Sequence, residues 1–76
     1  MSAVIDLEAT GENIRRIMHE RGVSAVEVQE ILGLASVKSV YHWIVGRSLP
    51  TVDHLVELAS VFDVTVDEIL VVNLEG

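Results

Sequence analysis

Polar side chains gather at the start of a predicted helix over residues 36–46, where they can donate hydrogen bonds to nucleic acid. Lys38 carries the amine that suits guanine O6 and N7, and Val37 can pack on the methyl group of thymine. The candidate base-reading residues are Ser36, Val37, Lys38, Ser39, Tyr41 and His42. Because this set lacks arginine, asparagine and glutamine, which make bidentate contacts to bases, an ordinary solvated helix face is the alternative interpretation.

A second set of residues suits the phosphate backbone. Arg47 and Ser48 follow the predicted helix in a loop that can reach the backbone. Ser24 opens the preceding helix, where free backbone amides can hold a phosphate. Such contacts would fix the position of the protein on DNA and carry no sequence preference.

Two short helices joined by a tight turn are expected to position both sets. Ser24 and Glu27 have the spacing of a capping box, and Gly33 suits the left-handed residue that ends a helix. Ser36 can cap the second helix. Two short helices at a fixed angle, the second free on one side, form a helix-turn-helix, here over residues 24–47.

The whole chain is predicted to be one all-α domain over residues 1–76, a compact five-helix bundle. Capping residues precede apolar residues at three- and four-residue spacing at Thr10, Ser24, Ser36, Thr51 and Thr65. The inward-facing residues expected from this spacing are Ile14, Ile17, Met18, Val28, Ile31, Leu32, Val40, Trp43, Val52, Leu55, Leu58, Ala59 and Phe62. Residues 4–7 and 70–74 are β-prone and partly alternating. They are expected either to pair as short strands, within one molecule or between two, or to lie over the core as irregular tails.

The charge distribution bears on the kind of partner. The net charge of −7 weighs against nucleic acid, because lysine and arginine supply most of the affinity for phosphates. All five basic residues nevertheless lie between positions 15 and 47, a segment of net charge +2, whereas residues 1–14 carry −3 and residues 48–76 carry −6. A dipolar molecule of this kind can still turn its positive side toward DNA.

Arginines on the predicted first helix have two interpretations. One or two of Arg15, Arg16 and Arg21 can flank DNA, but Arg16 also lies four residues from both Glu12 and Glu20, and such pairs stabilise a helix. We therefore leave these arginines out of the candidate site.

The sequence offers no support for an enzyme, a metal site or a cofactor. Without cysteine there is no disulfide and no thiolate nucleophile. His19, His42 and His54 fall on three different predicted helices with no carboxylate at ligand spacing, and no nucleophile sits beside a base. No apolar run approaches the about 18 residues of a membrane span, and the first residues lack the positive start of a signal peptide. A cytoplasmic protein is therefore expected.

Over about residues 10–71 the pattern resembles the lambda-repressor-like helix-turn-helix proteins of the Cro or XRE type. The segments that carry the resemblance are residues 14–22, 24–29, 33–34, 40–43, 46–50, 58–59 and 64–70, with Leu55. It implies a five-helix DNA-binding domain that works as a transcriptional regulator, commonly as a dimer on a two-fold symmetric operator.

One departure from the family pattern concerns a pair of charged residues. Many members pair an arginine late in the first helix with a glutamate late in the third, where this chain has Met18 and Ile44. An apolar contact can replace a partly buried ion pair at little cost in stability. We therefore predict that Met18 and Ile44 touch.

The sequence favours a sequence-specific DNA-binding regulator, with helix 36–46 in the major groove, that acts as a dimer because one small domain offers too little surface for tight specific binding. Residues 69–74 or 4–7 are the candidate dimer surfaces. The alternative is a protein-interaction or antitoxin-like module that keeps the fold with weak DNA affinity. An exposed patch of Val37, Tyr41, Ile44 and Val45 would favour the protein partner. Burial of Val45 beneath an exposed face of Lys38, Ser39, His42 and Arg47 would favour DNA.

Overall fold

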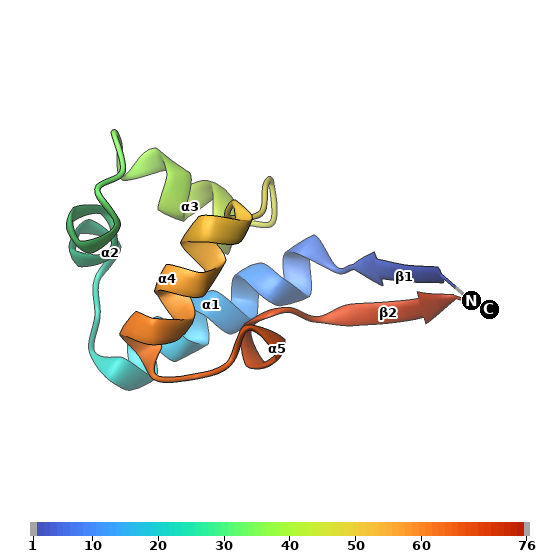
Figure 1. Cartoon of the computed structure of the whole chain (residues 1–76). Coiled ribbons are helices and arrows are strands. Elements are labelled where there is room, and N and C mark those ends of the chain that lie inside the picture. The colour runs from blue at the N-terminus through green and yellow to red at the C-terminus, as the bar shows by residue number, and fades with distance from the viewer. Residues whose placement is uncertain (1, 76) are drawn as a thin grey trace.

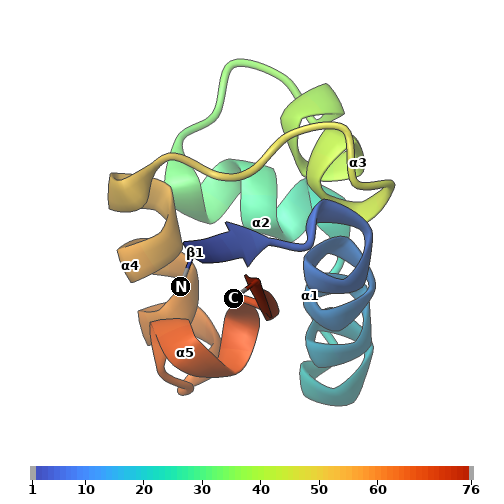
Figure 2. The ribbon, with the colours of Figure 1, turned by 90° about the vertical axis from the view of Figure 1, so that its right-hand side faces the viewer.

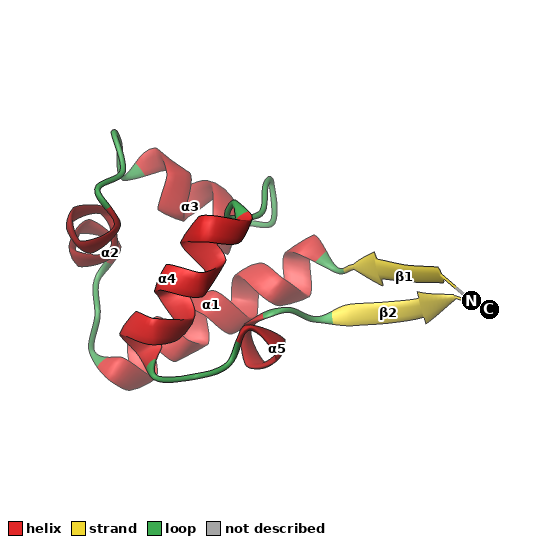
Figure 3. Cartoon of the chain, in the orientation of Figure 1, coloured by secondary structure: helices red, strands yellow, loops and turns green. Residues whose placement is uncertain are grey.

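The computed structural model describes residues 2–75, which form five helices and a two-stranded sheet. The elements are β1 (Ser2–Ile5), α1 (Leu7–Arg21), α2 (Ala25–Leu32), α3 (Lys38–Ile44), α4 (Val52–Phe62), α5 (Val66–Ile69) and β2 (Val72–Glu75). The helices form one body, from which β1 and β2 project together (Figures 1 and 3). The predicted helical bundle with short terminal strands is therefore confirmed. Met1 and Gly76, the ends of the predicted domain, lie outside the described residues.

The start of α1 corrects the prediction. Its N-cap is Asp6, whose Oδ1 accepts a hydrogen bond from the Ala9 N–H at 2.9 Å, so Thr10 lies inside the helix and is not a cap. Thr10 is fully buried, and its Oγ1 accepts a hydrogen bond from the Val71 N–H at 2.9 Å. Asp6 and Thr10 are both good capping residue types, and their spacing alone does not show which one acts. The Thr10 hydroxyl instead fixes the segment before β2 against α1.

Most of the other predicted helix ends are confirmed. The side-chain hydroxyls of Ser24, Thr51 and Thr65 each accept a hydrogen bond from the backbone N–H of the residue three positions later. Gly33 ends α2 in the left-handed conformation, with a φ of 66°. The third helix corrects the prediction, because it begins at Lys38 with Val37 as its N-cap, although the Oγ of Ser36 accepts the Lys38 N–H at 3.1 Å.

The core draws on all five helices. The buried apolar side chains are Ile14, Ile17, Met18, Val28, Leu32, Val40, Trp43, Leu55, Leu58, Ala59, Phe62 and Ile69. Two predicted core residues are wrong, because Ile31 is 56% exposed and Val52 is 76% exposed. α2 has only eight residues, and its buried side is the narrow pair Val28 and Leu32. Val52 is the first residue of α4 and extends past the core.

Within residues 2–75, none of the helices combines the length and the apolar composition needed to cross a lipid bilayer.

Backbone-to-backbone contact fixes α3 against α1. A Cβ atom at Gly11 would lie 2.3 Å from the carbonyl oxygen of Trp43 and 2.6 Å from that of Ile44. Beyond the end of α3, Gly46 has a φ of 78°, and a Cβ there would lie 2.9 Å from the Cα of Glu8. Glycine is therefore required at both points, and the first turns of α1 determine where α3 ends.

Met18 and Ile44 both contribute to the packing between helices. Met18 is buried in the core, and Ile44 is half-buried and packs against the core. Ile44 therefore does not point away into solvent. This agrees with the idea that an apolar contact replaces the family's charged pair. Direct contact between the two side chains stays a prediction.

β1 and β2 form an antiparallel ribbon from the two ends of the described chain, seen end-on in Figure 2. The register places Ala3 opposite Leu74, Val4 opposite Asn73 and Ile5 opposite Val72. At its base the Asp6 N–H donates to the carbonyl oxygen of Val71 at 2.8 Å, and the Asn73 side chain donates to Asp6 Oδ2 at 3.3 Å. Of the alternatives for the termini, pairing within one molecule is the one observed.

We predict that Gly11→Ala destabilises the protein, although alanine favours a helix over glycine by about 1 kcal/mol. The added methyl group would force α3 away from α1, and overpacking of this kind costs about 1–3 kcal/mol. Urea unfolding followed by helical circular dichroism measures the change in free energy of unfolding. Glu12→Ala, at the exposed neighbouring position, is the control and should leave stability nearly unchanged. A Gly11→Ala variant more stable than the wild type would contradict the close approach.

Candidate nucleic-acid interface

α3 presents one continuous row of exposed side chains on the side away from the core. Lys38, Tyr41 and His42 are exposed, and Val45, directly after the helix, is 60% exposed. Residues three, four and seven positions apart share one face of a helix. Lys38, Tyr41, His42 and Val45 therefore form a single surface, which we call the α3 stripe.

The remaining predicted base-reading residues are less accessible. Ser36, Val37 and Ser39 are half-buried. The Ser36 hydroxyl accepts the Lys38 N–H, so one of its acceptor positions is already used in starting the helix. These three residues flank the α3 stripe and do not form its centre.

The loop after α3 is held against the end of the helix. Backbone N–H groups of Arg47 and Ser48 donate to the His42 carbonyl oxygen at 2.9 and 3.4 Å, and both residues are exposed. Arg47 and Ser48 are thereby brought together with the α3 stripe. Ser24 is exposed but stands at the opposite end of α2 from the turn, about 12 Å of helix away.

Electrostatics distinguish this region from the rest of the molecule. Between Glu30 and Asp53 the sequence contains Lys38 and Arg47 and no acidic residue. The segment 31–52, which holds all of α3 and both of its flanking loops, therefore has a formal charge of +2 in a chain of net charge −7. No carboxylate belongs to α3 or to its flanking loops, although Glu8 of α1 lies against Gly46 in the loop after α3.

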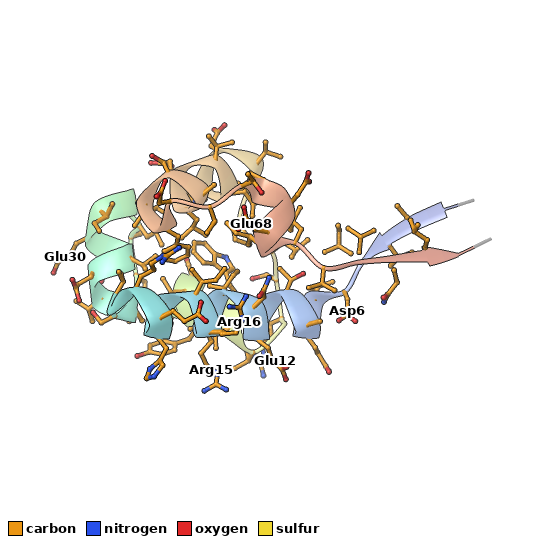
Figure 4. The ribbon with its side chains drawn as sticks, turned by 90° about the horizontal axis from the view of Figure 1, so that it is seen from below. Asp6, Glu12, Arg15, Arg16, Glu30 and Glu68 are labelled. Atoms are coloured by element: carbon orange, nitrogen blue, oxygen red, sulfur yellow. The ribbon has the colours of Figure 1, made fainter. Side chains whose placement is uncertain are left out.

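The three arginines of α1 have different roles. Arg16 pairs with Glu20 at 2.8 Å and also bonds to the Asn13 side chain, which confirms its interpretation as a helix-stabilising residue. Arg21 donates from Nε to the Phe62 carbonyl oxygen at 2.9 Å and so holds the end of α4. Arg15 is exposed and points outward from α1, on the side away from Glu68 (Figure 4).

Three cationic side chains are consequently available to a ligand. Arg15, Lys38 and Arg47 make no side-chain hydrogen bond or ion pair with any other part of residues 3–74. Two of them belong to α3 and its loop. The third, Arg15, is not among the residues that the sequence predicts for the site, because its spacing does not show that it is free of local pairing.

The exposed residues of α3 match neither the apolar patch that would favour a protein partner nor the polar face that would favour DNA. Val37 and Ile44 are half-buried, so the expected apolar patch with Tyr41 and Val45 is incomplete. Val45 is exposed, whereas a purely polar face required its burial. The sequence allows either exposure or burial of Val45, and the structure shows it exposed directly after α3, which ends at Ile44, before the expected end at residue 46.

The histidines are dispersed over the molecule. The His54 ring lies 6.1 Å from the Trp43 ring, at an angle of 47°, and is half-buried beside the core. Within the described part of the chain, no three histidine or carboxylate side chains come together as metal ligands.

The helix-turn-helix family, of the Cro/C1 type, matches residues 14–69, and the chain belongs to this family. Among solved structures, it is similar to the DNA-binding domain of BldD, with 30% sequence identity and a TM-score of 0.72. That likeness covers 87% of this chain and 94% of the BldD domain. No curated protein matches the chain.

Proposed function

We propose that this protein is a sequence-specific DNA-binding transcriptional regulator, a single domain over residues 1–76 that inserts α3 into the major groove. The observation that carries the proposal is the α3 stripe, an exposed helical surface inside a 22-residue segment, 31–52, without acidic residues. Membership of the helix-turn-helix family and the likeness to the BldD domain support it. A groove-reading helix needs one free face and a rigid support on the other.

Within this proposal, different residues of the α3 stripe contact different groups on the bases. Lys38, near the N-terminus of α3, reads guanine O6 and N7, and His42 donates one turn later. Tyr41 and Val45 supply the apolar contacts that suit thymine methyl groups. The residues assigned to the phosphate backbone are Ser24, Arg47, Ser48 and Arg15. Ser36, Val37 and Ser39 act at the edge of the contact.

The regulator is proposed to act as a dimer. One domain of this size presents about 600–1,000 Å² to DNA, less than most tight specific complexes use. Two copies whose α3 helices lie about 34 Å apart, one turn of DNA, would double the contact and read a two-fold symmetric operator.

A second candidate function rests on the apolar part of the stripe. Tyr41 and Val45 are 53% and 60% exposed on the same face, and the chain as a whole is acidic. Such a face also suits the groove of another protein, as in an antitoxin-like module with weak DNA affinity. Loss of DNA binding in the experiment below, with the protein folded, would favour this candidate.

We predict that Lys38→Ala weakens DNA binding about tenfold, because it removes a charge-assisted contact to a base worth about 1–3 kcal/mol. Fluorescence anisotropy with the DNA upstream of the protein's own gene and with a randomised duplex pool measures both affinity and preference. Each titration is repeated from low to physiological salt, where a protein that neutralises phosphates weakens steeply.

The matched control is Arg16→Ala, which removes an exposed cation that is already paired with Glu20. It should change affinity less than about twofold, since only the general charge is altered. Equal losses in the two variants would mean that charge alone matters and that α3 does not read bases. No binding by the wild type at low salt would overturn the proposed function.

We further predict that Ser24 contributes to DNA binding beyond its role as a cap. Ser24→Ala and Thr65→Ala each remove a capping box and should each cost about 1 kcal/mol in the free energy of unfolding. Only Ser24→Ala should also weaken DNA binding, because Thr65 begins α5. Equal DNA affinity in the two variants would limit Ser24 to capping.

A further inference from the structure

The β1–β2 ribbon has one face made only of apolar side chains. Residues directly opposite each other in an antiparallel pair share a face, and successive residues alternate between faces. The register therefore places Ala3, Leu74, Ile5 and Val72 on one side, with Val4 and Asn73 on the other. We call the first side the apolar ribbon face.

This face is not covered by the rest of the molecule. Leu74 is 67% exposed and Val72 44% exposed, Ala3 is exposed, and only Ile5 is half-buried. The ribbon extends beyond the helices in Figure 1, so no described helix can fold over it. An isolated two-stranded ribbon is at best marginally stable in water, and three or more strands or a packing partner are needed to hold one.

We infer that the apolar ribbon face binds the same face of a second copy of this chain around a two-fold axis. The inference deepens the proposed function, on whose need for a dimer it rests in part. In such an interface each face meets its own equivalent, so an apolar face meets an apolar face. Ala3, Ile5, Val72 and Leu74 then pack against their counterparts.

Charge allows a second copy to approach at this place. Two chains of net charge −7 repel each other over most of their surfaces. The four residues of the apolar ribbon face, Ala3, Ile5, Val72 and Leu74, include no ionisable side chain, and the acidic residues next to them in the sequence are Asp6 and Glu75. Two acidic copies therefore meet little charge repulsion across this face itself, and the projection of the ribbon (Figure 1) keeps their helical bodies apart.

The ribbon is also firmly connected to the helix that supports α3. Asp6 both caps α1 and receives the Asn73 side chain, and the Thr10 hydroxyl accepts the Val71 N–H. The next residues of α1 meet the end of α3 at Gly11 and Gly46. Joining two ribbons would therefore set the separation and orientation of two α3 stripes.

The expected dimer is weak in the absence of DNA. A stable interface usually takes 20–30 residues a side, whereas the apolar ribbon face offers about four. Association should accordingly be measured by sedimentation equilibrium up to about 1 mM protein, a range that includes weak complexes.

The decisive variants are Val72→Lys and Val4→Lys. The two valines are equally exposed, at 44%, and lie in the same ribbon on opposite faces. Val72→Lys places two like charges across the proposed interface and should raise the dimer dissociation constant at least tenfold, whereas Val4→Lys should change it less than about twofold. Equal effects of the two substitutions, or a wild type that stays monomeric throughout, would overturn the inference.

Cysteine substitution provides a second test that does not depend on charge. The chain has no cysteine, so a single Val72→Cys or Val4→Cys variant reports one position. Under mild oxidation Val72→Cys should form a disulfide-linked dimer and Val4→Cys should not. Equal yields from both would overturn the assignment of the face, even if Val72→Lys proved too unstable to measure.

Failure of this inference can be told from failure of the proposed function. Specific DNA binding by a wild type that never dimerises, in solution or on DNA, would overturn the ribbon interface and leave DNA recognition standing. A dimer that depends on Val72 but binds no DNA would support the interface and overturn DNA recognition.

Discussion

The close approach of α1 and α3 at Gly11 is the constraint on which the rest of the structure depends. A helix of seven residues is too short to be stable by itself in water, so α3 owes its existence to its packing. At Gly11 that packing joins main chain to main chain, and main-chain atoms cannot change rotamer to relieve a misfit. The buried Trp43 and the half-buried Ile44 complete the contact. The α3 stripe is thus the free side of a helix whose other side has little room to move.

The location of the charged residues says more about the partner of this protein than its net charge does. All twelve acidic residues lie outside residues 31–52, although the chain as a whole is strongly acidic. A separation of this kind gives the molecule an orienting field, because a polyanion attracts the α3 side and repels the remainder. The same arrangement makes binding sensitive to ionic strength, since each exposed cation acts through water. Of the basic residues outside this segment, Arg16 pairs with Glu20 within α1, and Arg21 joins α1 to the end of α4 through the Phe62 carbonyl group.

Features that depend on neighbouring residues could be predicted from the sequence, whereas features that depend on contacts between distant parts of the chain could not. The capping box at Ser24 and the left-handed Gly33 depend on neighbouring residues, and both were predicted correctly. The cap of α1 is Asp6 and not the predicted Thr10, whose hydroxyl instead bonds to Val71 at the far end of the chain. Ile31 matched the helical spacing of a core residue, but no other element covers that side of α2. In the candidate interface, helical spacing placed Lys38, Tyr41 and His42 together, and all three are exposed, but it did not decide whether Val45 is exposed or buried.

The ribbon also has a consequence for folding. Its two strands come from opposite ends of the described chain, and such distant segments meet only after the intervening chain has closed a long loop. Asn13 on α1 donates to the carbonyl oxygens of Glu68 and Ile69 just before β2, so the packing of α1 against α5 brings the two strands together. The apolar ribbon face therefore exists only when both ends of the described chain are in place. A partly folded chain does not display it, which makes self-association conditional on complete folding.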